Sequence, residues 1–137
     1  MQESMEPVTL RGEVTAFSGK GRSLGYPTAN VGTMTDLKDG VYFGFADMGK
    51  FHDQPALIFI GTPTTVGDKD RRVEAHLLDI PDTDYYGLNL SLSVMHYHRP
   101  NRTFKSVREL LAHMKQDENI ARRWFKVGKP VRGWRQT

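Results

Sequence analysis

Hydrophobic and polar residues alternate over much of the first hundred positions of this chain. Near the N-terminus, Val8, Leu10 and Val14 are separated by polar residues, which is typical of a half-buried strand. The stretch 55–61 is too apolar to alternate and predicts a strand that is buried on both faces. The predicted strands cover 8–16, 41–48, 55–61, 72–79 and 88–98.

One amphipathic helix is predicted after the strands. Ser106 followed by Glu109 forms a capping box, and Gly128 and Pro130 are typical of a helix end. At about 1.5 Å per residue, a helix of this span is roughly 30 Å long. Its apolar stripe, which we interpret as core packing, consists of Val107, Leu110, Leu111, Met114, Ala121, Trp124 and Phe125.

The order of these elements indicates a fold class. Five or six strands joined by short turns, with no helix between them, favour an antiparallel barrel or sandwich over a βαβ sheet. The chain has 137 residues, of which 38% are hydrophobic, and this is enough for one ordinary globular domain. We predict a single domain over 1–137, with a core of about 8–126 and a C-terminal tail over 127–137.

Composition excludes several classes of protein. The absence of cysteine excludes disulfides, thiolate zinc sites and a cysteine nucleophile. No stretch approaches the roughly 18 apolar residues of a membrane span, and the first residues lack the basic and apolar regions of a secretory signal. We therefore expect a soluble, cytoplasmic protein without a membrane partner.

The net charge of +3 suggests nucleic acid only weakly. Basic residues near the C-terminus also suit a helix end and a solvated tail, which is the commoner arrangement. The cluster consists of Arg122, Arg123, Lys126, Lys129, Arg132 and Arg135.

A glycine-rich stretch between the first two predicted strands is the main candidate for ligand chemistry. Gly19, Gly21 and Gly25 lie within seven residues, with Lys20 and Arg22 between them, so the backbone could approach an anionic ligand closely. This composition suits a phosphate-binding loop. A hairpin loop with two solvated basic residues explains the spacing equally well.

The segment that follows this loop should be extended, because Pro27 fixes its own φ and disfavours a helical Tyr26. In an extended chain the side chains of Thr28 and Asn30 point the same way. A hydroxyl and an amide oxygen are neutral, hard ligands that suit Mg²⁺.

The predicted strand 72–79 carries a second candidate group. Its alternation brings Glu74, His76 and Leu78 to one face, opposite Val73, Ala75 and Leu77. Glu74 could act as a general base, and His76 could orient it or border the site. From the residues alone, a solvent-facing strand carboxylate is the simpler interpretation of Glu74.

These motifs together resemble the riboflavin kinase family, also called flavokinase. The resemblance runs from about Val8 to Phe125, with the family's signatures in order. It depends on the segments 21–30 (GRSLGYPTAN), 40–42 (GVY), 60–64 (IGTPT), 73–79 (VEAHLLD) and 86–87 (YG). The connection after Asn30 is shorter than the family's, and Asp39 stands where proline is common.

The resemblance implies a mainly β fold, a six-stranded antiparallel Greek-key barrel with one long C-terminal α-helix. It also implies transfer of the γ-phosphate of ATP to the 5′-hydroxyl of riboflavin, which gives FMN and ADP, with Mg²⁺ or another divalent metal. The adenylyltransferase half of bacterial members is absent from the sequence, so we expect FMN as the final product. A monomer is the default for a small barrel with one helix, and no nucleic-acid partner is expected.

The family's functional residues carry over by matching positions, as the resemblance implies. Glu74 matches the proposed catalytic base, and Thr28 and Asn30 match the residues that hold the metal. The nucleotide-binding positions are Gly19, Lys20, Gly21, Arg22, Thr28, Asn30 and Tyr86. The flavin-binding positions are Arg99, Phe104 and Asp117, of which Arg99 and Asp117 could also be ordinary surface residues.

Two other functions fit parts of the sequence. One is a flavin or nucleotide binding module of the same fold that does not turn over, although the intact set of Thr28, Asn30 and Glu74 argues against it. The other is a small basic barrel that stacks single-stranded nucleic acid on Tyr42, Phe43 and Phe45. That function requires these aromatic rings to be exposed.

Overall fold

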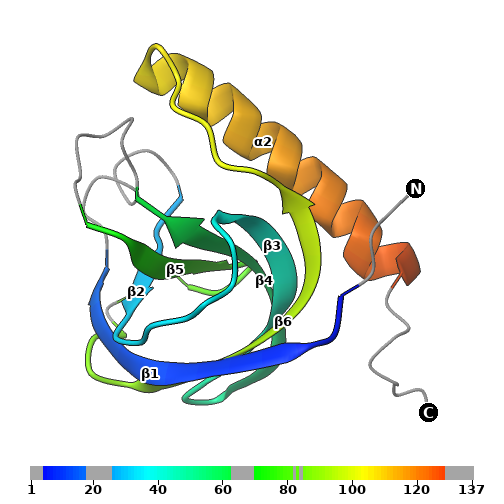
Figure 1. Ribbon diagram of the computed structural model, residues 1–137. Coiled ribbons are helices and arrows are strands. Elements are labelled where there is room, and N and C mark those ends of the chain that lie inside the picture. The colour runs from blue at the N-terminus through cyan, green and yellow to red at the C-terminus, as the bar shows by residue number, and fades with distance from the viewer. Residues whose placement is uncertain (1–4, 18–25, 63–69, 82, 84, 129–137) are drawn as a thin grey trace. The chain divides into compact units, whose positions relative to one another are not determined.

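The computed structural model describes residues 5–17, 26–62, 70–81, 83 and 85–128. The chain forms two compact units, Met1–Thr103 and Phe104–Thr137. The first unit contains the strands and the second contains the helix (Figure 1).

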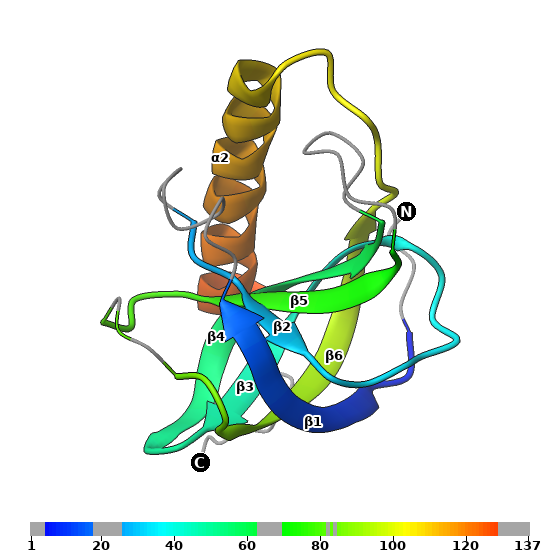
Figure 2. The same cartoon turned by 90° about the vertical axis from the view of Figure 1, so that its left-hand side faces the viewer.

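The first unit is a closed barrel of six strands in the order β1-β2-β5-β4-β3-β6. Every neighbouring pair is antiparallel. Strands β3, β4 and β5 form a meander and β6 returns beside β3, which is a Greek key (Figures 1 and 2). The predicted fold class is confirmed. The strands are β1 Val8–Phe17, β2 Ala29–Val31, β3 Gly40–Met48, β4 Phe51–Gly61, β5 Arg72–Leu77 and β6 Asn89–Arg99.

Alternation along the strands explains why the sheet closes around a core. In β5, Val73, Ala75 and Leu77 are buried, whereas Glu74 and His76 are half-buried. The buried set joins apolar residues from all six strands in one cluster inside the barrel. Each large aliphatic side chain of this set contributes about 1.5–3 kcal/mol through burial, and each alanine contributes less, so the pattern itself fixes which face turns inward.

The strands differ from the predictions by more than one residue in three places. β4 begins at Phe51, four residues early, because a polar segment with Asp53 at φ 51° still pairs with β3. β2 is an additional strand of three residues. β5 ends at Leu77, since Asp79 has a φ of 62°, and Leu78 is buried instead of sharing the half-buried face of Glu74.

The second unit contains α2, Val107–Arg123, followed by the π-helical turn η2, Trp124–Gly128. Ser106 is the N-cap, and its side chain accepts a hydrogen bond of 3.1 Å from the backbone N–H of Glu109. The Glu109 carboxylate in turn accepts a bond of 3.0 Å from the backbone of Lys105. The predicted helix and its N-cap Ser106 are therefore confirmed, but the return bond goes to the backbone of Lys105 instead of Ser106 as in a capping box. The last turn is wider than an α-helix.

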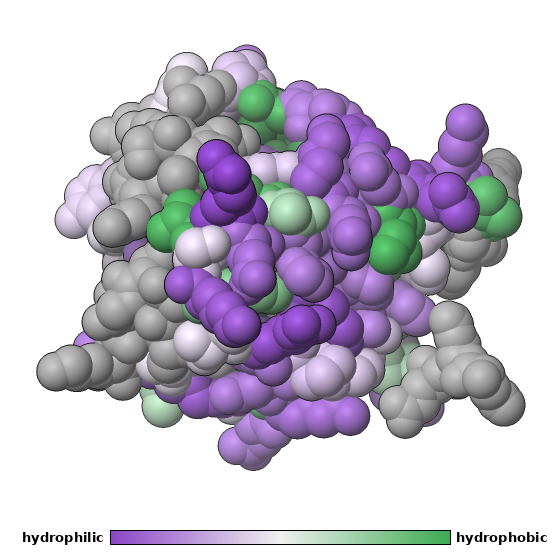
Figure 3. Space-filling model, turned by 90° about the horizontal axis from the view of Figure 1, so that it is seen from above, coloured by the Kyte–Doolittle hydropathy of each residue, from purple (hydrophilic) through white to green (hydrophobic). Residues whose placement is uncertain are grey.

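One face of the described surface is mainly hydrophilic. Figure 3 shows polar side chains over most of the coloured part of one face, with the hydrophobic residues separated from one another. Within the described residues, no helix is long and apolar enough to cross a membrane.

Candidate active site

Strands β2 and β5 bring the predicted catalytic and metal-binding residues together. In their ladder Asn30 lies directly opposite Glu74, and Ala29 lies opposite Ala75. Both alanines belong to the cluster inside the barrel, so Asn30 and Glu74 turn to the outer face of the sheet. Thr28, two residues before Asn30, turns to that face as well, as the sequence predicts.

Each oxygen of the Glu74 carboxylate has a partner, one through a hydrogen bond and the other through a longer ion pair. Thr28 Oγ1 donates a hydrogen bond of 3.1 Å to Glu74 Oε1, and Arg72 Nη1 lies 3.8 Å from Glu74 Oε2. Thr28 is only 4% exposed, and the Glu74 side chain is 16% exposed. Glu74 is therefore not the solvent-facing carboxylate that the sequence pattern alone favours.

The side chain of Asn30 has an unusual environment. Its Oδ1 is buried and has no hydrogen-bond partner in the part of the chain that the structure describes. A buried acceptor without a partner costs about 1–3 kcal/mol, so such an atom suggests that a ligand completes its environment. Together with the Thr28 hydroxyl, this amide oxygen fits a divalent cation that keeps several waters and binds substrate phosphates.

Acidic residues and histidines of the described ranges do not offer a cation site in place of Thr28 and Asn30. Within the described ranges, no group of three or more His, Cys, Asp or Glu side chains is placed to hold a metal ion. The neutral pair of Thr28 and Asn30 is thus the candidate metal site of this face.

His76 fixes the segment that leads into Thr28. Its Nδ1 lies 2.8 Å from the carbonyl oxygen of Pro27, and its ring meets the ring of Tyr26 edge-on, with centroids 5.2 Å apart. A carbonyl oxygen can only accept, so Nδ1 carries the proton. His76 therefore borders the candidate site and orders the backbone before the Thr28 hydroxyl.

The predicted flavin residue Arg99 lies in the same transverse row as Glu74. The register of the sheet places Asn30, Glu74, Phe59, Val41 and Arg99 opposite one another in turn across five strands. At about 4.8 Å per strand, Arg99 is roughly 14 Å along the sheet from Glu74. Because β5 and β6 are three strands apart in a closed barrel of six, the row curves around the barrel, and Glu74 and Arg99 lie on opposite sides of it.

The other predicted site residues lie in a turn, in the second unit or outside the described residues. Tyr86 is 67% exposed in a turn, and the backbone of the next residue, Gly87, bonds to Val14 in β1. Phe104 and Asp117 belong to the second unit and are 7% and 2% exposed. Within that unit the Phe104 ring lies 4.6 Å from the ring of His113. Gly19, Lys20, Gly21 and Arg22 lie outside the described residues.

Two histidines of β6 pack against an aromatic ring of β3. The rings of His96 and His98 stack on Phe43 with centroids 5.4 Å and 4.7 Å away. Burial, and secondly the charge of His98, lower the pKa of His96 from its ordinary value of 6.5.

The aromatic residues of β3 do not form a platform for nucleic-acid bases. Tyr42, Phe43 and Phe45 are 2%, 0% and 5% exposed. Stacking of bases needs an exposed ring face, so the nucleic-acid hypothesis loses the surface on which it depended.

Sequence reasoning missed Arg72. The signal was present, because Arg72 precedes Glu74 by two residues in a predicted strand and so shares its face. In the sequence, the charged stretch Asp70-Arg71-Arg72 resembles an ordinary solvated turn, and nothing distinguishes one arginine from the other. In the structure, Arg72 is distinguished by its contact with Glu74.

Comparison with known proteins identifies the family. The family model for riboflavin kinase (Flavokinase) matches residues 4–125, which is most of the chain. This chain belongs to the riboflavin kinase family. The resemblance in the sequence motifs is thereby confirmed.

Relatives of this riboflavin kinase family member include longer, multifunctional proteins. It is 32% identical over 130 residues to the trifunctional protein RibF/MnmA of Mycoplasmoides gallisepticum, covering 92% of this chain and 20% of that one. It is also 32% identical over 124 residues to a bifunctional riboflavin kinase/FMN phosphatase of Arabidopsis thaliana, covering 85% of this chain and 33% of that one. The chain thus spans a fifth to a third of these two curated relatives.

A solved structure supports the same family and fold. The crystal structure of riboflavin kinase from Trypanosoma brucei matches with a TM-score of 0.70 and 27% identity. The match covers 93% of this chain and 84% of that one, so both the barrel and the C-terminal helix have counterparts in that protein.

Proposed function

We propose that this chain is a riboflavin kinase that transfers the γ-phosphate of ATP to the 5′-hydroxyl of riboflavin. The observation that carries the proposal is the convergence of Thr28, Asn30 and Glu74 on one face of the β2–β5 ladder. The proposal includes a monomeric protein that works in the cytoplasm, where ATP is available, and that needs no nucleic acid or membrane.

In this proposal Glu74 is the catalytic base. It accepts the proton of the 5′-hydroxyl as that oxygen forms a bond to the γ-phosphorus and the bond to the β–γ bridging oxygen breaks, leaving FMN and ADP. Phosphoryl transfer depends mostly on positioning and charge neutralisation. A carboxylate that accepts a hydrogen bond from Thr28 and faces Arg72 suits this role, because these contacts favour one orientation before the substrate arrives.

Thr28 and Asn30 would hold Mg²⁺, and their oxygens support this role by their burial and shared face. The metal, when bound, would neutralise the phosphate oxygens of the nucleotide. We further propose that Gly19, Lys20, Gly21 and Arg22 cover these phosphates and that Tyr86 lies near the adenine. Arg99, Phe104 and Asp117 would border the flavin.

The test is to incubate the purified protein with riboflavin, Mg²⁺ and ATP, with CTP in parallel, and to separate the flavins by chromatography. We expect FMN only when nucleotide and metal are both present. Glu74→Gln should lower kcat by about 10²- to 10⁴-fold, the usual contribution of a general base. Wild-type turnover in that variant would show that Glu74 is not the base. Tight riboflavin binding without any product would favour a non-catalytic flavin module.

A further inference from the structure

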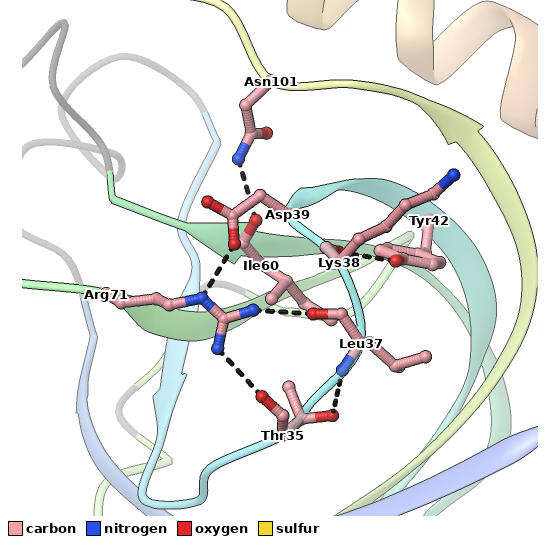
Figure 4. A network of polar contacts seen from close by, with 8 residues as sticks. All are labelled: Thr35, Leu37, Lys38, Asp39, Tyr42, Ile60, Arg71 and Asn101. Atoms are coloured by element: carbon pink, nitrogen blue, oxygen red, sulfur yellow. Dashed lines mark hydrogen bonds and ion pairs between the residues drawn. The ribbon is translucent and has the colours of Figure 1, made fainter.

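Two adjacent arginines at the beginning of β5 have different surroundings. Arg71 binds the connection between β2 and β3: Nε donates to Asp39 Oδ1 at 2.7 Å, Nη1 to the Thr35 carbonyl at 2.9 Å and Nη2 to the Leu37 carbonyl at 2.6 Å. Figure 4 shows this guanidinium surrounded by the three acceptors. Arg71 thereby anchors the backbone at the point where β5 begins.

Arg72 turns instead to the face that carries Glu74. Its Nη1 is 3.8 Å from Glu74 Oε2, and its side chain is 30% exposed. Residues i and i+2 of a strand share a face, so the two side chains leave an anchored backbone in the same direction. The pairing is therefore a result of the strand geometry and of the Arg71 anchor next to it.

The contact adds an ion-pair partner to a carboxylate that already accepts a hydrogen bond. Thr28 donates to Oε1, and Arg72 faces Oε2, so each oxygen of Glu74 has its own partner. A carboxylate with a partner at only one oxygen can turn about its terminal bond, which has a broad torsional minimum. The hydrogen bond at Oε1 and the charge of Arg72 facing Oε2 together favour one plane for the group and one direction for its remaining lone pairs.

We propose that Arg72 is a positioning residue that holds the carboxylate of Glu74 in the orientation needed to accept the substrate hydroxyl proton. This inference rests on the function proposed above. Arg72 acts through Glu74, and its substitution lowers the rate of the chemical step while leaving riboflavin binding in place. Its planar guanidinium has several N–H donors in a fixed arrangement, which a lysine lacks.

The experiment is a double-mutant cycle of Arg72→Gln and Glu74→Gln, measured by single-turnover formation of FMN. Arg72→Gln alone should lower the rate by about 5- to 20-fold, within the usual range for coupled neighbouring residues. In the Glu74→Gln background, Arg72→Gln should change the remaining rate by less than about twofold, because the carboxylate on which Arg72 acts has been removed. Arg72→Lys should recover part of the rate.

Binding and folding controls separate positioning from a structural role. Riboflavin binding, followed by quenching of flavin fluorescence, should stay within about twofold of wild type in Arg72→Gln, since the residue acts on the chemical step. Arg11→Gln, at an exposed arginine of β1, is the matched control and should keep the wild-type rate and melting temperature.

Each outcome has a distinct meaning. A wild-type rate in Arg72→Gln, or an equal loss in both backgrounds, would overturn the role of Arg72 while leaving the riboflavin kinase proposal intact. If Glu74→Gln itself retained the wild-type rate, the assigned base and its positioning residue would both be wrong. If the wild-type protein formed no FMN, the proposed function would fail.

Discussion

Thr28 and Asn30 offer oxygens of different kinds to the same face. The Thr28 hydroxyl donates its hydrogen to Glu74 and still has lone pairs to offer. Asn30 Oδ1 can only accept, and it is buried without a partner among the described residues. One hydroxyl can therefore serve the base and the cation together, whereas the amide oxygen can serve only the cation.

Replacement of Thr28 tests this shared role. Thr28→Val keeps the shape but removes the hydroxyl, so kcat should fall and the Mg²⁺ concentration needed for half-maximal rate should rise, each by about 10- to 100-fold. Thr28→Ser keeps the hydroxyl and should stay close to wild type. The measurement is a Mg²⁺ titration of the rate of FMN formation. Equal rates for the valine and serine variants would contradict the assignment.

At the scale of residues, the sequence predicted which groups share a face but not which groups touch. Pro27 and the two-residue spacing were enough to align Thr28 with Asn30, and alternation was enough for Glu74. The contact between Thr28 and Glu74 spans 46 positions and depends on the pairing of β2 with β5, which no local pattern contains. Arg72 shares a strand face with Glu74, but a shared face does not by itself show that the two side chains are in contact.

At the scale of elements, β6 carries a group whose protonation opposes folding. The pKa of His96 is lowered, chiefly by burial and also by His98, so the folded chain binds this proton less readily than the unfolded chain does. The contribution of neutral His96 to the free energy of unfolding is therefore fully present above the ordinary pKa of 6.5. It is lost as the pH falls through the lowered pKa.

We expect the free energy of unfolding to decrease as the pH falls from about 7.5 toward 5, a range chosen to span the ordinary pKa of histidine. His96→Gln should make this decrease smaller. His52→Gln, at a side chain that is 75% exposed, is the matched control and should leave the decrease in place. Urea denaturation at several pH values measures it. An unchanged slope in His96→Gln would show that His96 is not responsible.

The elements themselves were predictable where their patterns were long. β1, β3 and β6 deviate from their predicted bounds by one residue or less at each end. β2 has only three residues, too few to show a period, and the start of β4 is polar. The conformation of the connection between β2 and β3 could not be predicted from a hydrophobic pattern. Arg71 binds backbone carbonyl oxygens there, and any sequence provides such oxygens (Figure 4).

At the scale of the whole barrel, closure depends on close contact between β3 and β6. Gly44 lies opposite Val94, next to a register shift in this ladder. A Cβ at Gly44 would collide with the carbonyl oxygen of Ser93 and lie 3.0 Å from Ile58 Cδ1. The strands can approach this closely because position 44 has no side chain.

Gly44→Ala should therefore lower the free energy of unfolding by about 1–3 kcal/mol, the usual cost of overpacking. Gly32→Ala is the matched control: its new Cβ would lie 3.0 Å from the Cγ2 of Thr15, the end of an exposed side chain that can move. Chemical denaturation of both variants measures the difference. Equal stability of the two would argue against a tight closure at Gly44.

The closure of the barrel was also the part of the fold that the alternation of hydrophobic and polar residues could not predict. Alternating strands form sandwiches as well as barrels, and the six residue pairs from Val8↔Val94 to Glu13↔Asn89 that join the first strand to the last have no local signature. The family resemblance favoured the barrel over the sandwich, and the closed strand order confirms it.

The shortest strand of the barrel lies beside the residues that would hold the substrate phosphates. β2 is joined to β1 and to β5 by only three residue pairs on each side. Short elements open locally at a low free energy, and a ligand that binds only the closed form shifts this local equilibrium by mass action. Amide hydrogen exchange at Asn30 and Val31 would then report occupancy of the nucleotide, and the barrel would gain rigidity where its substrate binds.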